Sequence, residues 1–292
     1  MVSTVPNTIE NGCSERTHTE TEFNSSACDR VGMRANRHED RTVVVTGGSS
    51  GIGRGIAVRF AEEGANVVVA DVQRRPRRGE YFETDAETPT DELVREVGSE
   101  ATFVETDVSD PAEAEAMVHA TVESFGGLDV LVNNAGIHVP GDSQELTPDE
   151  WDEVVGVDLD GSFYAAKYAV PHLTDASGAL INVGSVHSSQ GGGGPAYASA
   201  KAAVVNLTRD LAVELGPDSV NVNCICPGFV KTAVQDYHTD ESMQREIDHT
   251  LLPEVGDPED IGDVAVFLAS DEASFVHGES IYVDGGWTAH RV

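Results

Sequence analysis

A tyrosine and a lysine stand four residues apart in the segment PAYASAKAAV, which covers residues 195–204. Tyr197 and Lys201 share one face if this segment is helical, because residues i and i+4 of a helix are neighbours. An isolated tyrosine has a pKa of about 10 and is a poor base at neutral pH. A nearby ammonium stabilises the phenolate and lowers that pKa. The pair could therefore take a proton from a hydroxyl group, although the spacing alone also fits an ordinary surface pair.

Lysine is rare in this chain, which contains three lysines and fifteen arginines. A compact ammonium on a flexible stem suits the task at position 201, and the guanidinium fork of arginine is not equivalent. Ser185 precedes Tyr197 and ends the strand-like segment GALINVGS (178–185). Its hydroxyl could hold a substrate oxygen beside the tyrosine. Ser188 and Ser189 lie past the end of this strand and rank below Ser185.

A glycine-rich loop, TGGSSGIG at 46–53, follows a strand-like run and opens a helical one. Glycines allow a tight turn and a close approach of the backbone to a phosphate, and the N-terminus of a helix supplies N–H donors and a positive dipole. The loop therefore predicts a dinucleotide site, with a plain glycine turn as the alternative. The residues assigned to this site are Gly47, Ser49, Ser50, Gly51, Ile52 and Gly53.

Asp71 ends the second expected strand and bears on the choice of dinucleotide. An acid at this place accepts the adenosine ribose 2′-hydroxyl and repels a 2′-phosphate, so it favours NAD over NADP. The segment RRPRR at 74–78 could instead bind a phosphate, but these arginines follow the key position and also fit a solvated loop. We expect NAD, with NADP as the less favoured cofactor.

Two further segments are expected to contact the cofactor. Asp107 and Val108 follow the third expected strand and are placed to meet adenine. The segment NNAG at 133–136 ends the fourth, and ligands bind at the carboxyl ends of the strands in open parallel sheets. We assign Asn134, Ala135 and Gly136 to the cofactor site, with an Asn-Gly turn as the alternative.

The elements that must position these residues alternate along the chain from residue 41. Strands are expected at 42–47, 66–71, 102–107, 129–136, 178–185, 220–228 and 279–286, and helices at 51–63, 111–125, 148–172, 197–215 and 258–269. Thr147, Pro148 and Glu150 form a typical helix start. The pattern predicts an α/β fold: one Rossmann-like, doubly wound parallel sheet of about seven strands with helices on both faces.

The charge of the chain limits its partners. Lys plus Arg is 18 and Asp plus Glu is 51, which gives a formal net charge of −33. Such a chain repels nucleic-acid phosphates and anionic membranes, so neither is expected as a partner. The acid excess favours a halophilic protein, because concentrated salt screens the self-repulsion of its surface. An acidic mesophilic protein is the alternative.

The cysteines indicate neither a metal site nor a disulfide framework. Cys13 and Cys28 lie in the irregular N-terminal region, and Cys224 and Cys226 alternate along VNVNCICPG, where we expect them to point to opposite faces of a strand. We therefore expect no metal and a reducing, cytoplasmic compartment. The sequence has neither a signal-peptide core nor an apolar run long enough for a membrane helix.

The chain is expected to form one catalytic domain over residues 41–292, after a polar and disordered extension over residues 1–40. The substrate pocket should draw on His187, His138, the loop 188–194 and the segment 229–256, which is a plausible lid. With Ser185 and Tyr197, His187 suits a hydroxylated substrate such as a sugar or polyol. Alternatively, His187 only bonds the backbone. Trp287 could line a neighbouring pocket or pack at a subunit interface.

Together these motifs resemble the short-chain dehydrogenase/reductase superfamily over residues 42–288. The resemblance implies an NAD(P)-dependent oxidoreductase in which Tyr197 exchanges the substrate hydroxyl proton, Lys201 also holds the nicotinamide ribose, and Ser185 orients the substrate. It also implies a homodimer or homotetramer. The motifs occur in the family order: TGGSSGIG, Asp71, TDV at 106–108, NNAG, Ser185, YASAK, PGFVKT at 227–232, which carries the cofactor residues Pro227, Gly228, Val230 and Thr232, and YVDGG at 282–286.

One position departs from the family pattern. The family places an asparagine, which completes a proton relay, where this chain reads VDLDG and has Asp158. The backbone carbonyl that can hold the relay water is kept, but the amide donor is lost. A carboxylate here could pair with Lys201 or raise the pKa of Tyr197, so Asp158 is counted among the catalytic candidates.

The expected function is an NAD-dependent interconversion of a secondary alcohol, such as a sugar or polyol, and its carbonyl compound. An NADPH-linked 3-oxoacyl-thioester reductase is the alternative, which RRPRR favours and the net charge of −33 disfavours. A non-catalytic nucleotide-binding protein on the same fold is a lesser alternative, because such proteins usually lose the tyrosine or the lysine.

Overall fold

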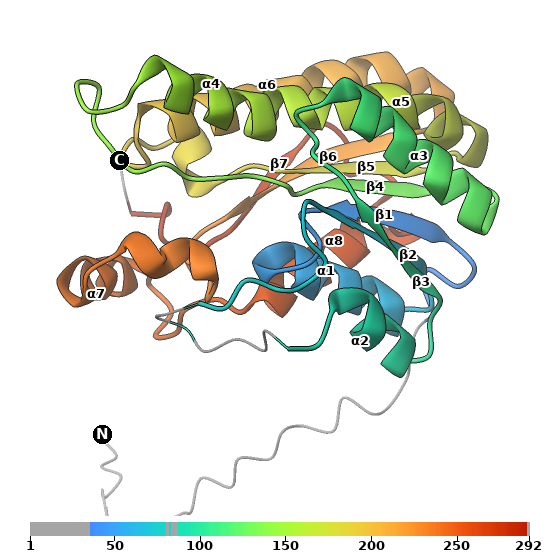
Figure 1. Ribbon diagram of the computed structural model, residues 1–292, viewed down its shortest axis with the longest axis horizontal. Coiled ribbons are helices and arrows are strands. Elements are labelled where there is room, and N and C mark those ends of the chain that lie inside the picture. Colours follow the sequence, from blue (N-terminus) through green and yellow to red (C-terminus); the bar gives the residue numbers. More distant parts are fainter. Residues whose placement is uncertain (1–35, 80–81, 83–86, 291–292) are drawn as a thin grey trace, which may run out of the picture. The chain divides into compact units, whose positions relative to one another are not determined.

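The computed structural model describes residues 36–79, 82 and 87–290 (Figure 1). Seven strands form one sheet in the order β3-β2-β1-β4-β5-β6-β7, and every neighbouring pair is parallel. The predicted α/β fold with a parallel sheet is confirmed. The strands are β1 (Thr42–Thr46), β2 (Asn66–Asp71), β3 (Ala101–Glu105), β4 (Val130–Asn133), β5 (Ala179–Val183), β6 (Asn221–Pro227) and β7 (Ser280–Val283).

Helices cover both faces of this sheet, α3 to α6 on one side and α1, α2 and α8 on the other (Figure 1). Alternate strand residues serve the two layers: Val43 and Val45 of β1 pack toward α1 and α8, and Val44 packs toward α3 and α5. Successive side chains of a strand point to opposite faces, which is why the buried strands are apolar throughout. The helices are α1 (Gly51–Glu62), α2 (Thr90–Glu96), α3 (Pro111–Phe125), α4 (Pro148–Val155), α5 (Gly161–Ala176), α6 (Pro195–Leu215), α7 (Asp240–His249) and α8 (Pro258–Leu268).

The order of the strands in the sheet determines where a ligand site can form. Strand order runs in opposite directions from β1 and β4, so a crevice opens at the carboxyl ends of these two strands. Ligands of doubly wound sheets bind at such a switch point. The loops after β1, β2, β4, β5 and β6, which carry most of the predicted site residues, all leave this edge.

Local signals explain where the helices begin. The hydroxyl of Thr147 accepts a hydrogen bond from the Glu150 N–H, and the Glu150 carboxylate accepts one from the Thr147 N–H, which forms the expected capping box. The predicted single helix over 148–172 is instead interrupted by a π-helical turn, Gly156–Asp160, between α4 and α5. Such turns often occur at functional sites, and this one carries Asp158.

Two sequence-based expectations were wrong in detail. Residues 36–40 were expected to be disordered, yet His38 is fully buried with its Nε2 2.9 Å from the Val266 carbonyl oxygen. The folded unit therefore begins before residue 41, and residues 1–35 of the expected extension lie outside the described residues. Cys224 and Cys226 share one face of β6, with sulfurs 4.0 Å apart, because residues two apart on a strand point the same way.

Candidate active site

A cleft of about 430 Å³ lies at the carboxyl edge of the sheet, where the predicted cofactor residues gather. Ser49 and Val230 are buried and do not line it, Gly53 packs behind the loop, and Gly228 lines a neighbouring pocket. The predicted residues that line the cleft are Gly47, Ser50, Gly51, Ile52, Asp71, Asp107, Val108, Asn134, Ala135, Gly136, Ser185, Tyr197, Lys201, Pro227 and Thr232.

The glycine loop after β1 leads into the start of α1, which has no side-chain cap. Gly47 and Gly51 have positive φ angles of 63° and 52°, which side-chain-bearing residues rarely adopt. Ser50 is the N-cap of α1, but its side chain makes no capping hydrogen bond, and its hydroxyl accepts one from the Arg77 N–H at 2.7 Å. The first-turn N–H groups of α1 thus lack a side-chain cap, and the first turn holds no acid. This arrangement fits a phosphate group.

Asp71 lies at the end of β2, beside this loop. Its Oδ2 accepts a hydrogen bond from the Ser49 N–H at 3.0 Å, which ties the carboxylate to the glycine loop. Burial raises the pKa of Asp71, and the Ser49 N–H and Arg77 oppose that rise. Of the RRPRR arginines, Arg77 lines the cleft, whereas Arg74 pairs with the Asp91 carboxylate at 2.7 Å.

Asn134 forms hydrogen bonds to the chain at the start of the glycine loop. Its side-chain Nδ2 donates to the carbonyl oxygens of Thr46 at 2.9 Å and Gly47 at 3.2 Å. The Thr46 hydroxyl in turn accepts from the N–H groups of Asn134 and Ala135. The segment NNAG therefore fastens the end of β4 to the glycine loop, which goes beyond the simple turn considered as its alternative.

Tyr197 and Lys201 lie on one face of α6, as the spacing predicted, and both line the cleft. The Lys201 ammonium is buried and donates to the Val183 carbonyl oxygen at 3.1 Å. Ser185 also lines the cleft, and its side chain acts to lower the pKa of Tyr197. By contrast, the Ser188 hydroxyl donates to the Lys201 carbonyl oxygen at 2.9 Å. The structure thus brings Ser185, and not Ser188, to the tyrosine.

Asp158 lies beside this pair from the π-helical turn. It is fully buried, and its Oδ1 accepts a hydrogen bond from the Ile137 N–H at 2.7 Å. Its Oδ2 lies 3.4 Å from the Lys201 ammonium nitrogen, and no other described residue is hydrogen-bonded to this oxygen. Gly136 makes room for this pair, because a Cβ there would lie 3.1 Å from the ammonium and 3.3 Å from both carboxylate oxygens.

Asp158, Tyr197 and Lys201 shift one another's pKa values. Burial raises the pKa of Tyr197, Lys201 acts to lower it, and Asp158 acts to raise it further. Burial alone would lower the pKa of Lys201, but Asp158 and Tyr197 hold the ammonium form and the net shift is upward. Burial likewise raises the pKa of Asp158 against the pull of Lys201. The expectation that lysine lowers the tyrosine pKa thus describes one contribution, which burial outweighs.

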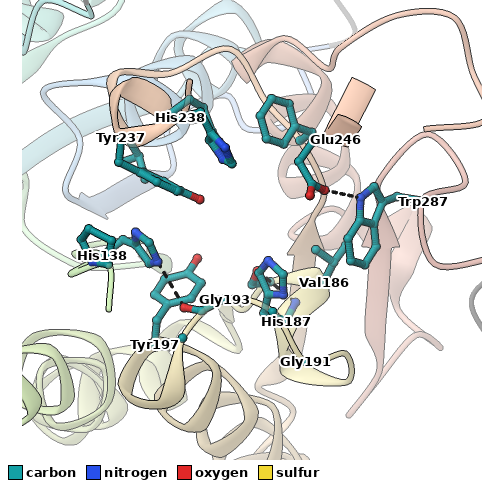
Figure 2. Close-up of a pocket in the computed structure, with 18 of the residues that line it drawn as sticks. His138, Val186, His187, Gly191, Gly193, Tyr197, Tyr237, His238, Glu246 and Trp287 are labelled. Carbon is teal, nitrogen blue, oxygen red and sulfur yellow. Dashed lines mark hydrogen bonds between the residues drawn. The ribbon is translucent and has the colours of Figure 1, made fainter. Parts of the chain in front are cut away.

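A second pocket, of about 280 Å³, adjoins the cleft, and Ser185 and Tyr197 line both. His138 and His187, predicted for this pocket, line it with their rings 5.2 Å and 6.4 Å from the ring of Tyr197. Figure 2 shows the Tyr197 hydroxyl pointing toward the open centre. Further lining groups that sequence reasoning did not single out are Tyr237, His238 and Glu246.

The predicted lid supplies one wall of this pocket. Within residues 229–256, the chain forms a short 3-10 turn, Ala233–Tyr237, and then α7. Glu246 of α7 accepts a hydrogen bond from the Trp287 indole N–H at 2.9 Å (Figure 2). Trp287 is 2% exposed and lines the same pocket, so α7 is fastened to the C-terminal segment.

Comparison with known proteins identifies the family to which the chain belongs. Residues 47–288 match the family model described as enoyl-(acyl carrier protein) reductase. The chain belongs to the short-chain dehydrogenase/reductase family. Members of this family use NAD(P), and relatives within it act on CH–OH groups.

Two curated relatives in this family align over nearly their whole length. Meso-2,3-butanediol dehydrogenase of Serratia marcescens is 39% identical over 255 residues, which cover 87% of this chain and 96% of that protein. The 3-oxoacyl-(acyl-carrier-protein) reductase of Staphylococcus aureus is 37% identical over 248 residues, which cover 84% and 97%.

Solved structures of the family share the fold. Levodione reductase superimposes with a TM-score of 0.77 at 33% identity, covering 87% of this chain and 99% of that one. A structure from Agrobacterium tumefaciens that contains bound NADP has a TM-score of 0.74 at 35% identity, covering 86% and 98%. Among the described residues of this chain, no helix meets the length and apolarity needed to cross a membrane, and no cluster of three or more His, Cys, Asp or Glu could hold a metal ion.

Proposed function

We propose that this short-chain dehydrogenase/reductase is an NAD-dependent dehydrogenase of a secondary alcohol, with a small hydroxylated molecule such as a polyol or sugar as substrate. The observation that carries the proposal is the place of Tyr197 and Ser185, which line both the cofactor cleft and the adjoining pocket. A carbinol in that pocket meets a hydroxyl and a phenol at the entrance to the cleft.

The residues present fit a nicotinamide dinucleotide. The uncapped first turn of α1 offers N–H donors to its phosphates, and Asp71 offers an acceptor to the adenosine ribose. Asp107 and Val108 line the cleft where adenine is expected, Lys201 lines it beside Tyr197, and Thr232 lines it beside Gly51. A bound dinucleotide would supply the hydride acceptor for oxidation of the alcohol and the hydride donor for reduction of the ketone.

The chain's own residues handle the proton and the orientation. Tyr197 takes the proton from the substrate hydroxyl in the oxidative direction and returns it in the reductive one. Ser185 holds the substrate oxygen beside the phenol, and Lys201 favours the phenolate through its charge. Asp158 holds Lys201 as an ammonium and opposes ionisation of Tyr197.

Asp71 is the residue that supports a preference for NAD. Arg77 is the residue that supports the alternative preference for NADP. Asp71 ends β2, as an acid that accepts the ribose hydroxyls should, and it repels a 2′-phosphate. Arg77 lines the same cleft and offers a cation, although its neighbour Arg74 is paired with Asp91 and Glu92. The alternative, an NADPH-linked 3-oxoacyl-thioester reductase, is supported by Arg77 and by the Staphylococcus aureus relative.

We also propose that the chain assembles with copies of itself. Phe163 on α5 and Val213 on α6 are 46% and 80% exposed, and a partner subunit would cover such apolar side chains. Light scattering of the purified chain gives the mass of the assembly, and a monomer would contradict this part of the proposal.

Initial rates with NAD and NADP in parallel, over sugars, polyols and secondary alcohols, test the proposed function. We expect turnover with NAD on a polyhydroxy substrate, measured at about 2 M KCl because salt screens the self-repulsion of an acidic surface. Turnover with NADP alone, or activity confined to acyl thioesters, would instead favour the reductase alternative. Binding of NAD without any oxidation would favour a non-catalytic protein.

A further inference from the structure

Among the described residues that line the substrate pocket, one carries a fixed charge, and that charge is negative. Glu246 is the carboxylate, and no lysine or arginine is among the described residues that line the pocket. Three histidines line it: His138, His187 and His238. Burial lowers the pKa of each of these imidazoles and so disfavours their charged form. Among the described side chains that line this pocket, a ligand therefore meets one carboxylate and no lysine or arginine.

The Glu246 carboxylate is held in place and keeps room for a ligand. Its Oε2 accepts the hydrogen bond from the buried Trp287 indole, which fixes the side chain against the wall. A carboxylate has two oxygens and about four acceptor positions, so one bond leaves capacity for another donor. Figure 2 shows Glu246 and Tyr197 on opposite sides of the open centre of the pocket.

The field of Glu246 reaches the other groups of the pocket. It acts to raise the pKa of His187, His238 and Tyr237, which come from the loop after β5 and from the lid segment. The carboxylate therefore acts on the space that a substrate would occupy and not only on the surface of α7. An anion placed there would lose hydration and gain repulsion, whereas a hydroxyl or ammonium group would gain a charge-assisted hydrogen bond.

We propose that Glu246 is a specificity-determining residue, which accepts a hydrogen bond from a second donor group of the substrate and excludes substrates that carry a carboxylate or phosphate. The donor is a hydroxyl or an ammonium group, which share this chemistry. The inference rests on the proposed function, because it requires Tyr197 to act on a carbinol held in this pocket. Both attraction to one class and repulsion of another contribute to such selectivity.

Four secondary alcohols of the form CH3–CH(OH)–X test this directly, because they share the reacting carbinol and differ only in X. They are propane-1,2-diol, 1-aminopropan-2-ol, lactate and butan-2-ol, which offer a hydroxyl, an ammonium, a carboxylate and an ethyl group. Both enantiomers of each are assayed with both dinucleotides. The KCl concentration is the lowest that keeps the enzyme folded, because salt screens the charge being tested.

For the wild-type enzyme we expect the diol or the amino alcohol to exceed butan-2-ol in kcat/KM by at least about tenfold, and lactate to be the poorest of the four. The order of the diol and the amino alcohol distinguishes a hydroxyl from an ammonium as the preferred donor. A kcat/KM for lactate equal to that for the diol would overturn the inference.

The variant Glu246→Gln removes the charge but keeps an oxygen that can accept from Trp287. We expect the lactate-to-diol ratio of kcat/KM to rise by about tenfold or more, and butan-2-ol to change little. Asp248→Asn is the matched control, because Asp248 lies on the same helix, is exposed and does not line the pocket. It should leave all the ratios unchanged.

The outcomes separate two failures. If neither wild-type nor variant enzyme turns over any of the four alcohols, or a wider set of secondary alcohols, with either dinucleotide, the proposed function fails. If the alcohols are oxidised but Glu246→Gln changes all four by the same factor, the proposed function stands and the role of Glu246 is contradicted. Unchanged melting temperatures for both variants show that the comparison concerns the pocket and not folding.

Discussion

The carboxylate of Asp158 and the ammonium of Lys201 lie 3.4 Å apart in the interior, where each is almost completely buried. Asp158 stands where the family pattern has an asparagine, and the π-helical turn that carries it brings it to this place. The pair adds a negative charge next to a lysine whose positive charge favours the phenolate of Tyr197. The balance between the two bears directly on the pH at which the tyrosine works.

Removal of that negative charge should move the pH dependence of alcohol oxidation. Asp158 acts to raise the pKa of Tyr197, so Asp158→Asn should lower it and populate the phenolate at lower pH. Because the base form of the tyrosine accepts the proton, the acid limb of the kcat/KM profile should move to lower pH. The exposed Asp160 of the same π-helical turn provides the control Asp160→Asn, which should not move it. A limb that stays in place in Asp158→Asn would contradict this effect.

Cofactor choice should depend on Asp71. In Asp71→Ala the carboxylate that opposes a 2′-phosphate is gone, and we expect the ratio of kcat/KM for NADP to that for NAD to rise at least about tenfold. Arg77→Ala in the same background should reverse part of this gain, because Arg77 is the cation that lines the cleft there. An unchanged ratio in Asp71→Ala would show that the residue does not select the cofactor.

The contact between helices α1 and α8 should not tolerate a side chain at Gly55 of α1. A Cβ at Gly55 would lie 2.6 Å from the carbonyl carbon of Pro258, which is backbone and cannot move aside by rotation. We expect Gly55→Ala to lower the free energy of unfolding by about 1–3 kcal/mol, measured by urea denaturation at fixed salt. Gly127→Ala is the control, because nothing lies within 4 Å of a Cβ there. Equal stability of the two variants would mean that the two helices separate without cost.

The sequence predicted the sheet well, because buried parallel strands are apolar throughout and their boundaries coincide with turn residues. It also predicted that the motifs after β1, β2, β4 and β5 converge, since the carboxyl ends of parallel strands share one edge. The error over Cys224 and Cys226 was one of geometry, because alternation along a strand places residues i and i+2 on the same face.

The contact between α7 and the C-terminal segment could not be predicted in the same way. Trp287 was considered for a neighbouring pocket, but Glu246 is far from it in the sequence, and no local motif marks this glutamate. Their hydrogen bond arises only when α7 folds over the carboxyl edge and the C-terminal segment returns to meet it. The break in the helix at Asp158 was equally hidden, because the sequence from 148 to 172 reads as one amphipathic stretch.

The most direct test of the account compares wild-type enzyme with Tyr197→Phe, which removes one oxygen atom and keeps the ring. The measurement is the rate of reduced dinucleotide formation on the best secondary alcohol, with dinucleotide affinity measured in parallel by calorimetry. We predict that kcat falls by roughly 10²–10⁴-fold, the range that general acid–base groups contribute, while dinucleotide affinity stays nearly unchanged. A variant that keeps most of its activity would contradict the assignment of Tyr197 as the proton-transferring residue.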